Sequence, residues 1–538
     1  MIIDITKDTG PVLAAFFEGK DMLALADEIK DKSRHLSDNS QRVMDVGVLR
    51  PGVLEDLQAF AKEHGWRGLQ MLCSSVLGMI KDPQNARIGK LKGLPGALTD
   101  FFLRNAIDGW VYINDGNYHI PYLISEIKYV EPAKKEDQKP YVLMILRANL
   151  AAKTSRGSSI SDLKIIFDND DIVNQSLVGL LLAQNIYVET QELKALYLEQ
   201  LERFREFQPA FYQQFLITGL AYEQQYNDRM GKATKLGQGV TFKALNDEPQ
   251  ISRVFYDEIS NPYWEERAEQ GFNTLPYHCL VYLYNLETHS FVWVHVDNMQ
   301  PYVYKPELRE KLVLPEDHKE LIDILAGDLS LMEDMVENKT GGTTILCSGP
   351  PGLGKTLTAE VYCEVIARPL YRVHSGLLGT TAKDVEANLK EILARAQRWG
   401  AVALIDEADV YIRQRGDDID HNAVVASFLR TLEYFSGLLF MTTNRVADVD
   451  DAILSRCIAH IKYITPNDND RRRLWEVLGE QFQASLSSEL ITVLCEKYNT
   501  VGGRDIKELL KLAQKFSKGK KLPMTEELFV KCAQFRGL

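Results

Sequence analysis

The sequence lacks several features that would place the protein in a large class at once. None of its seven cysteines belongs to a CxxC pair, so a zinc ribbon is not expected, and their odd number in 538 residues argues against a disulfide framework. No apolar run reaches the roughly 18–20 residues that a membrane-spanning helix needs. The N-terminal stretch MIIDITKDTGPVLAAFFEGKD carries acidic residues where a signal peptide would be basic. These absences together predict a protein of the reducing cytoplasm with no membrane span.

An excess of basic charge is also missing. The formal net charge is -13, whereas a sequence-independent grip on nucleic acid relies on a basic surface. Nucleic acid is therefore not expected as the main partner, although a local basic patch stays possible. The composition, 45% hydrophobic and 25% charged, is ordinary for a globular protein, and the length exceeds one ordinary domain.

The N-terminal half changes its hydrophobic period along the chain. Residues 1–105 are expected to be mostly helical, residues 109–167 alternate as strands, and residues 190–207 return to a helical stripe. A second strand pair follows in PYHCLVYLYN and SFVWVHVDN. We predict a mixed α+β N-terminal domain over 1–205 and a β-containing connecting domain over 206–310. No catalytic constellation stands out in either.

A glycine-rich loop follows a buried strand in the stretch TTILCSGPPGLGKTLTAE, residues 343–360. The pattern from Gly349 to Lys355 and Thr356 is a P-loop, in which backbone N–H groups and a helix N-terminus converge on phosphate oxygens. Lys355 is expected to reach the β- and γ-phosphates, and Thr356 to bind Mg²⁺. The alternative, an ordinary Gly-Pro turn, is disfavoured because both the strand and the helix are in place. The predicted nucleotide-binding residues are Gly349, Pro350, Pro351, Gly352, Leu353, Gly354, Lys355, Thr356 and Leu357.

Two further strands end in polar side chains. AVALIDEAD places Asp406 at a strand tip, where it would hold Mg²⁺ directly or through water, and Glu407 beside it, where it would orient and deprotonate the attacking water. GLLFMTTN ends at Asn444, whose amide can position that water. The alternative is that Asp406 and Glu407 belong to an ordinary acidic turn. That interpretation is disfavoured because the two residues follow a P-loop by about fifty residues.

The motifs GPPGLGKT, LIDEAD, the TTN strand and the tripeptide SRC together resemble the AAA+ ATPase superfamily, most closely its AAA branch. The resemblance covers roughly residues 310–538. It implies an α/β P-loop module over 311–465, with a parallel sheet flanked by helices, and a small helical lid over 466–538. It also implies ATP and Mg²⁺ as cofactors and a homo-oligomeric, hexameric ring.

The resemblance assigns roles to arginines. Arg456, in the SRC tripeptide, corresponds to the finger that reaches a neighbouring subunit's ATP site and stabilises charge on the transferring phosphoryl group. The PGR context of many AAA proteins is absent, so Arg445 is an alternative finger, and a surface ion pair is the plain alternative for Arg456. Arg504, in GGRDIKELLKLA, corresponds to a second sensor of the γ-phosphate. The arginines at 471–473 are expected on the exposed face of the first lid helix.

One departure from the family concerns HSGLLGTTAKD, residues 374–384, which follows the second strand of the module. Threading AAA rings carry an aromatic residue in this loop, whereas here Leu377, Leu378 and Gly379 occupy it. Either the two leucines face a central pore with a weak apolar grip, or they pack locally and touch no substrate. The residues alone leave both alternatives open.

The predicted function is therefore an ATP-hydrolysing ring motor that remodels a protein or a protein complex. By family analogy, the N-terminal region binds the protein substrate or an adaptor. Two alternatives remain: a nucleic-acid-linked loader or motor, suggested by the SRC tripeptide, and a nucleotide-gated assembly scaffold.

Overall fold

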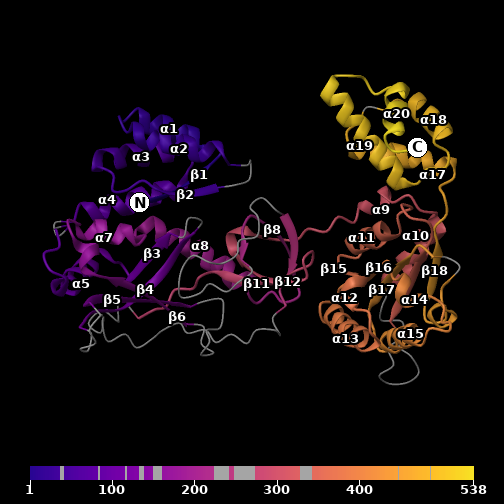
Figure 1. Ribbon diagram of the computed structural model, residues 1–538, viewed down its shortest axis with the longest axis horizontal. Helices are drawn as coiled ribbons and strands as arrows, with labels where there is room; N and C mark the ends of the chain where they lie inside the picture. Colours follow the sequence, from indigo (N-terminus) through magenta and orange to yellow (C-terminus); the bar gives the residue numbers. More distant parts are fainter. Residues whose placement is uncertain are drawn as a thin grey trace. The chain divides into compact units, whose positions relative to one another are not determined.

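The computed structural model describes residues 1–36, 41–82, 85, 87–114, 118–131, 139–149, 160–222, 241–247, 273–327, 342–445, 448–484 and 486–538. The chain divides into two compact units, Met1–Pro301 and Tyr302–Leu538, each taken here by itself (Figure 1). Among these residues no helix has the length and apolarity needed to cross a membrane.

The first unit begins with a helical region, as the sequence predicts. Its elements are β1 (Ile2–Thr6), α1 (Thr9–Glu18), α2 (Leu23–Arg34), β2 (Gln41–Asp45), α3 (Pro51–Glu63), α4 (Arg67–Ile80) and α5 (Leu94–Asn105). The strands β1 and β2 pair antiparallel, and the helices bury one apolar side each, as in α4, where Cys73, Val76 and Met79 are inaccessible to solvent.

Two antiparallel sheets complete the first unit. One has the strand order β6-β5-β4-β3-β7, and the other the order β13-β8-β10-β11-β12-β9. The first sheet and its helices comprise β3 (Trp110–Asn114), β4 (His119–Val130), β5 (Tyr141–Asn149), β6 (Ile160–Phe167), α6 (Asn169–Ile172), α7 (Leu177–Ala183), β7 (Ile186–Val188) and α8 (Gln191–Phe207). The second comprises β8 (Gln214–Thr218), β9 (Ala221–Tyr222), β10 (Thr241–Leu245), β11 (Leu280–Asn285), β12 (Ser290–His295) and β13 (Met299–Pro301). One cluster of buried side chains runs from Met1 to Met299, and the predicted division at 205 and 206 stays a prediction.

The second unit contains a parallel sheet with the strand order β15-β16-β17-β14-β18. Its strands are β14 (Thr343–Ser348), β15 (Leu370–His374), β16 (Val402–Asp406), β17 (Leu438–Thr443) and β18 (Ala459–Lys462). The helices of this region are α9 (Leu308–Lys311), α10 (Glu316–Gly327), α11 (Lys355–Val365), α12 (Ser375–Leu378), α13 (Ala382–Arg398), α14 (Asp409–Ile412), α15 (Ile419–Leu432) and α16 (Asp451–Leu454). Every residue of β14, β16 and β17 is buried, in keeping with the run of apolar residues that each strand contains. The predicted α/β module with a parallel sheet is confirmed.

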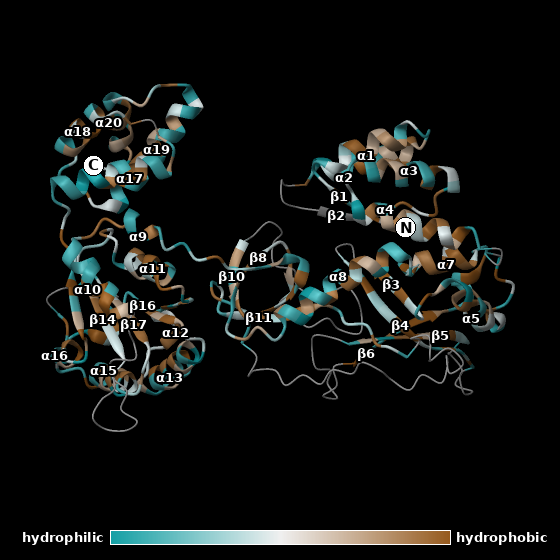
Figure 2. Ribbon diagram, turned by 180° about the vertical axis from the view of Figure 1, so that it is seen from behind, coloured by the Kyte–Doolittle hydropathy of each residue, from teal (hydrophilic) through white to brown (hydrophobic). Residues whose placement is uncertain are grey.

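The helices that follow the sheet form the lid (Figure 2). The lid has a hydrophobic core of its own, which includes Trp475. Its helices are α17 (Asp468–Gln481), α18 (Ser488–Lys497), α19 (Gly503–Lys520) and α20 (Glu526–Gln534). The expectation that all three arginines of 471–473 are exposed is wrong for Arg471, whose side chain is buried. Its guanidinium donates to Asp468 Oδ1 and to the Pro466 carbonyl, both at 2.7 Å, so it ties the start of α17 to the preceding loop. The predicted boundaries 310/311 and 465/466 stay predictions.

Candidate nucleotide site

The loop between β14 and α11 has the backbone of a phosphate cradle. Gly349, Gly352 and Gly354 all have positive φ, of 148°, 81° and 98°, a conformation that favours glycine. At Gly349 there is also no room for a side chain, because a Cβ atom would lie 2.4 Å from the carbonyl oxygen of Tyr463. The loop then enters α11 at Lys355, so the helix N-terminus points its free N–H groups into the cradle.

Lys355 closes the cradle from the first turn of α11. Its ammonium donates to the carbonyls of Gly349 and Pro350, both at 2.7 Å, and to Oδ1 of Asn444 at 2.9 Å. The residue is buried, and burial lowers the pKa of the ammonium while the carboxylates of Asp406 and Asp409 oppose that shift. All three acceptors are neutral oxygens, so a phosphate would offer this cation a stronger, charge-assisted partner. The predicted pair Lys355 and Asn444 is brought together.

Asp406 ends β16 beside the cradle. Its Oδ1 accepts hydrogen bonds from the hydroxyls of Thr356 at 2.9 Å and Thr442 at 2.5 Å, and its Oδ2 accepts from the Arg372 guanidinium at 2.6 Å. Burial by itself raises the pKa of Asp406, but these hydrogen bonds outweigh it and hold the pKa below its ordinary value. A hydroxyl and an ionised carboxylate in contact are the oxygen donors that Mg²⁺ prefers. Thr356 and Asp406 therefore fit the ion that the sequence predicts for them.

Glu407 follows in a strained backbone conformation. Its φ of 54° lies in the left-handed region, which is uncommon outside glycine, and such strain concentrates at functional sites. The Glu407 N–H donates to Thr442 Oγ1 at 3.0 Å, and the Ala408 N–H donates to the Thr442 carbonyl at 2.9 Å. The turn is thus held by β17 while Glu407 itself is exposed.

Three residues that the sequence reasoning missed support this edge of the sheet. Asp409 accepts from the Asn444 N–H at 3.2 Å and from the Thr443 hydroxyl, so it orients the end of β17. Thr442 and Arg372 both contact Asp406, as described above. The second aspartate of LIDEAD was a usable signal for Asp409. The other two come from strands whose alignment in the sheet cannot be read from local sequence.

The lid meets the cradle at the start of α19. The Arg504 N–H donates to the Gly352 carbonyl at 3.0 Å, and a Cβ at Gly352 would lie 2.9 Å from the Cβ of Arg504. Gly502 is equally close, since its Cβ would lie 3.0 Å from Leu353 Cδ2. The predicted sensor Arg504 is therefore next to the loop within one unit.

Arg456 and Arg445 have partners outside the cradle. Arg456, just after α16, is exposed and lies 3.9 Å from Glu433, with a hydrogen bond of 3.2 Å to the Ala452 carbonyl. Arg445 forms an ion pair with Asp448 at 3.5 Å. Among the described contacts neither arginine joins Lys355, Asp406 or Asn444.

The two leucines of the loop at 374–384 lie in different environments. Leu378 is fully buried at the end of α12, whereas 42% of Leu377 is exposed. The Asn388 side chain caps the turn by donating to the carbonyls of Leu377 and Leu378, both at 3.3 Å. Tyr411 holds it from the other side, donating to the Gly379 carbonyl at 2.9 Å. The expectation that both leucines could face a pore is therefore wrong for Leu378, which packs in the core.

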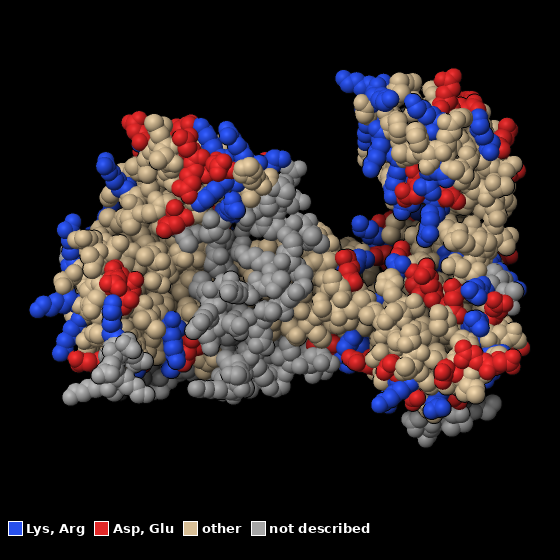
Figure 3. All heavy atoms as spheres, viewed as in Figure 1, with Lys and Arg blue, Asp and Glu red and all other residues tan. Residues whose placement is uncertain are grey.

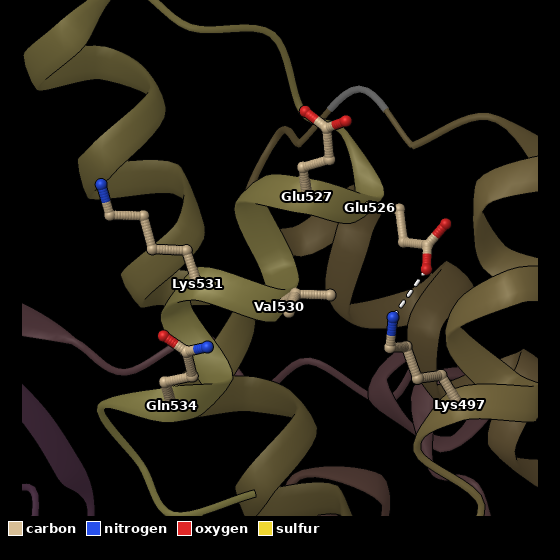
Figure 4. Close-up of a pocket in the computed structure, with 6 residues that line it drawn as sticks. All are labelled: Lys497, Glu526, Glu527, Val530, Lys531 and Gln534. Carbon is tan, nitrogen blue, oxygen red and sulfur yellow. Dashed lines mark hydrogen bonds and ion pairs between the residues drawn. The ribbon is translucent and has the colours of Figure 1, made fainter.

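A separate hollow of about 360 Å³ lies on the lid. It is bordered by Lys497 of α18 and by residues of α20, and the Lys497–Glu526 ion pair at 2.7 Å crosses it (Figure 4). None of the predicted site residues lines it. On the face shown in Figure 3, acidic and basic side chains intermingle over both units, without a broad field of one sign.

Comparisons with known proteins agree with this geometry. Residues 345–463 match the model of the ATPase family associated with various cellular activities (AAA). An uncharacterised AAA family ATPase of Sinorhizobium fredii is 35% identical over 122 residues, which is 21% of this chain and 36% of that protein. A putative 26S proteasome regulatory subunit homolog of Methanocaldococcus jannaschii is 30% identical over 173 residues, 30% of this chain and 46% of that protein.

Among solved structures, a chain of the HORMA:CdnC:Trip13 complex of E. coli MS115-1 aligns with a TM-score of 0.35 and 17% identity. The alignment covers 43% of this chain and 91% of that one. The chain spans less than half the length of the two relatives above. Residues 345–463 thus match the AAA family model, and the structure gives this region a P-loop and a parallel sheet in one module, so this part of the chain resembles an AAA ATPase domain.

Proposed function

We propose that the chain hydrolyses ATP with Mg²⁺ and uses the energy to remodel a protein or a protein complex. The observation that carries the proposal is the meeting of Lys355, Asp406, Asn444 and Arg504 at the cradle, from four separate segments of one unit. Those groups match the requirements of phosphoryl transfer, which are positioning and electrostatic stabilisation.

Each residue has a distinct task in this proposal. The cradle N–H groups and Lys355 bind the phosphates, and Arg504 contributes a further cation from the lid. Thr356 and Asp406 hold Mg²⁺, which neutralises charge that develops on the phosphate oxygens. Glu407 accepts a proton from the attacking water, and Asn444 orients that water. Asp409 and Thr442 hold the backbones of these two residues by accepting hydrogen bonds from the N–H groups of Asn444 and Glu407, respectively.

Arg456 completes the site of a neighbouring copy in a homo-oligomeric ring, for which a hexamer is our working assembly. Support comes from its exposure and from its weak, surface-exposed partner Glu433, because exposed pairs contribute little and exchange readily. A finger supplied by a neighbour makes hydrolysis depend on assembly.

We propose that the first unit, Met1–Pro301, recognises the protein substrate or an adaptor. A relative named as a proteasome regulatory subunit homolog supports a protein rather than a nucleic acid as the target. The net charge of -13 supports the same choice. All seven cysteines are free thiols, which supports a reducing, cytoplasmic location.

The test is ATP turnover by the full chain and by Glu407→Gln, with ATP binding measured beside it. Glu407→Gln should bind ATP and turn over at a small fraction of the normal rate, since the phosphate and metal contacts survive. Asp417→Asn, an exposed acidic residue of the same unit, is the matched control and should leave turnover unchanged. Equal turnover by Glu407→Gln and the unsubstituted chain would contradict the assignment.

Adding DNA or unfolded proteins to the turnover assay distinguishes the two alternative functions from a remodelling motor. Stimulation of turnover by single- or double-stranded DNA, and not by unfolded proteins, would favour the nucleic-acid-linked motor. Turnover that responds to neither, while ATP changes the oligomeric state, would favour the assembly scaffold. Capture of bound proteins on Glu407→Gln in the presence of ATP would identify the substrate class of a remodelling motor.

A further inference from the structure

Arg372 forms a direct contact with the carboxylate that is predicted to hold Mg²⁺. It lies on β15, which pairs in parallel with β16 so that His374 is opposite Asp406. The Arg372 Nη2 lies 2.6 Å from Asp406 Oδ2. The Asp406 side chain is only 10% exposed, so this ion pair is shielded on the carboxylate's side. Among the described residues, the other side-chain hydrogen bonds that Asp406 accepts come from the hydroxyls of Thr356 and Thr442, which are neutral donors.

A second carboxylate holds the same guanidinium on its other side. Arg372 Nη1 lies 3.4 Å from Glu360, which belongs to α11, the helix that begins with the cradle lysine. The Nε of Arg372 is buried without a hydrogen-bond partner among the described residues. Two carboxylates on two elements thus hold this guanidinium, and one of them, Asp406, is the predicted metal ligand.

The two carboxylate oxygens of Asp406 accept hydrogen bonds from different kinds of donor. Oδ1 accepts from the two neutral hydroxyls, whereas Oδ2 accepts from the cation. A fixed positive charge on a metal-ligating carboxylate repels an incoming divalent cation. Even at the dielectric constant of bulk water, a unit charge a few ångströms from a divalent ion opposes its binding by a factor on the order of ten.

We infer that Arg372 is a positioning residue that occupies Asp406 Oδ2 and sets the Mg²⁺ requirement of the nucleotide site. Without a metal, the charge of Arg372 balances that of Asp406 and keeps the carboxylate oriented. Binding of Mg²⁺ through Oδ2 would require the guanidinium to release that oxygen, and Glu360 would remain as its anchor. The inference rests on the proposed ATPase function, because it concerns the metal of that site.

The experiment measures ADP binding by the full chain as MgCl2 is raised, with a fluorescent ADP derivative as the probe. Arg372→Met keeps an unbranched stem similar to the aliphatic part of arginine and removes the charged head group. The concentration of Mg²⁺ that gives half of the metal-dependent gain in affinity should fall about tenfold. ADP affinity in EDTA should stay the same, since Lys355 and the loop are untouched. The same shift is expected in the Mg²⁺ dependence of turnover.

Two controls separate the charge from the contact. Arg372→Lys retains a cation and should keep the Mg²⁺ requirement within about twofold of normal. Arg430→Met removes an arginine whose partner is Glu386, 3.8 Å away on α13, and should change nothing. An unchanged or raised Mg²⁺ requirement in Arg372→Met would overturn the inference.

Two further outcomes keep the test decisive. If the unsubstituted chain binds no ADP under any condition, the proposed function fails, which is a different result from normal binding with an unshifted Mg²⁺ requirement. If Arg372→Met misfolds and therefore loses ADP binding in EDTA, the Glu360→Gln variant provides the test of the inference instead. It leaves Arg372 only one anionic anchor, Asp406, and should raise the Mg²⁺ requirement several-fold. No change in that variant would overturn the inference.

Discussion

The two leucines of the 374–384 loop offer a matched pair of substitutions with opposite expected effects. Leu378 is fully buried, and truncation of a buried leucine to alanine costs about 2–5 kcal/mol, from lost burial and from the cavity that remains. Leu377 is 42% exposed, and substitutions at such surface positions usually stay within about 0.5 kcal/mol. Leu378→Ala should therefore destabilise the second unit, whereas Leu377→Ala should not.

The assay is thermal unfolding of the full chain with and without ADP. A chain of two units need not unfold in one step, so the transition of the second unit is identified as the one that ADP shifts upward. For a unit of this size, about 1 kcal/mol corresponds to roughly 2–4 °C. Leu378→Ala should lower that transition by about 4–20 °C, and Leu377→Ala by about 2 °C or less.

The same pair tests whether this loop touches a substrate. Leu377→Ala should keep basal turnover within a few-fold of normal and reduce only the stimulation by a protein substrate. Equal losses of stability in the two variants would refute the buried-against-exposed reasoning. A Leu377→Ala variant with full substrate stimulation would refute a substrate contact at this loop.

The other predictions concern single groups. Lys355→Ala should abolish nucleotide binding, because it deletes the cation of the cradle, and an ADP affinity within threefold of normal would contradict that role. Arg456→Ala should bind ATP normally and hydrolyse it on the order of a thousandfold more slowly. Turnover should partly return when it is mixed with Lys355→Ala, and no recovery despite verified subunit exchange would place its role within one subunit. Gly349→Ala should impair nucleotide binding and stability together, since its Cβ would lie 2.4 Å from the Tyr463 carbonyl, and a fully active variant would show that the loop can move aside. Glu189 is buried beside Asp108, and burial raises the pKa of its carboxyl to about 7. The raised pKa means that protonated Glu189 contributes fully to the free energy of unfolding below the unfolded pKa of about 4.5. That contribution is lost as the pH rises toward 7. Glu189→Gln should therefore flatten the decline in stability across that window, and an unchanged pH profile of unfolding would argue against a buried proton there.

The nucleotide chemistry was predictable because its signals are local. The P-loop needs a strand, a glycine loop and a helix in immediate succession, and those eighteen or so residues determine the cradle themselves. The apolar runs in the strand that ends at Asp406 and in the strand before Asn444 predict that both strands are buried. Parallel strands place their carboxyl ends at one edge, so Lys355, Asp406 and Asn444 could be expected to meet.

The sequence by itself therefore determined the P-loop module and predicted the residues that the structure brings together around the cradle. Only the tertiary structure decided which side chains of ambiguous segments turn inward. Leu377 and Leu378 are adjacent and chemically identical, and the packing of α12 alone makes one exposed and the other buried. Arg471 looks like its neighbours in RRR, yet a loop carbonyl and an aspartate allow it to be buried. Arg372 reaches Asp406 across 34 positions of sequence because β15 and β16 pair in one register, and register is a property of the whole sheet rather than of either strand.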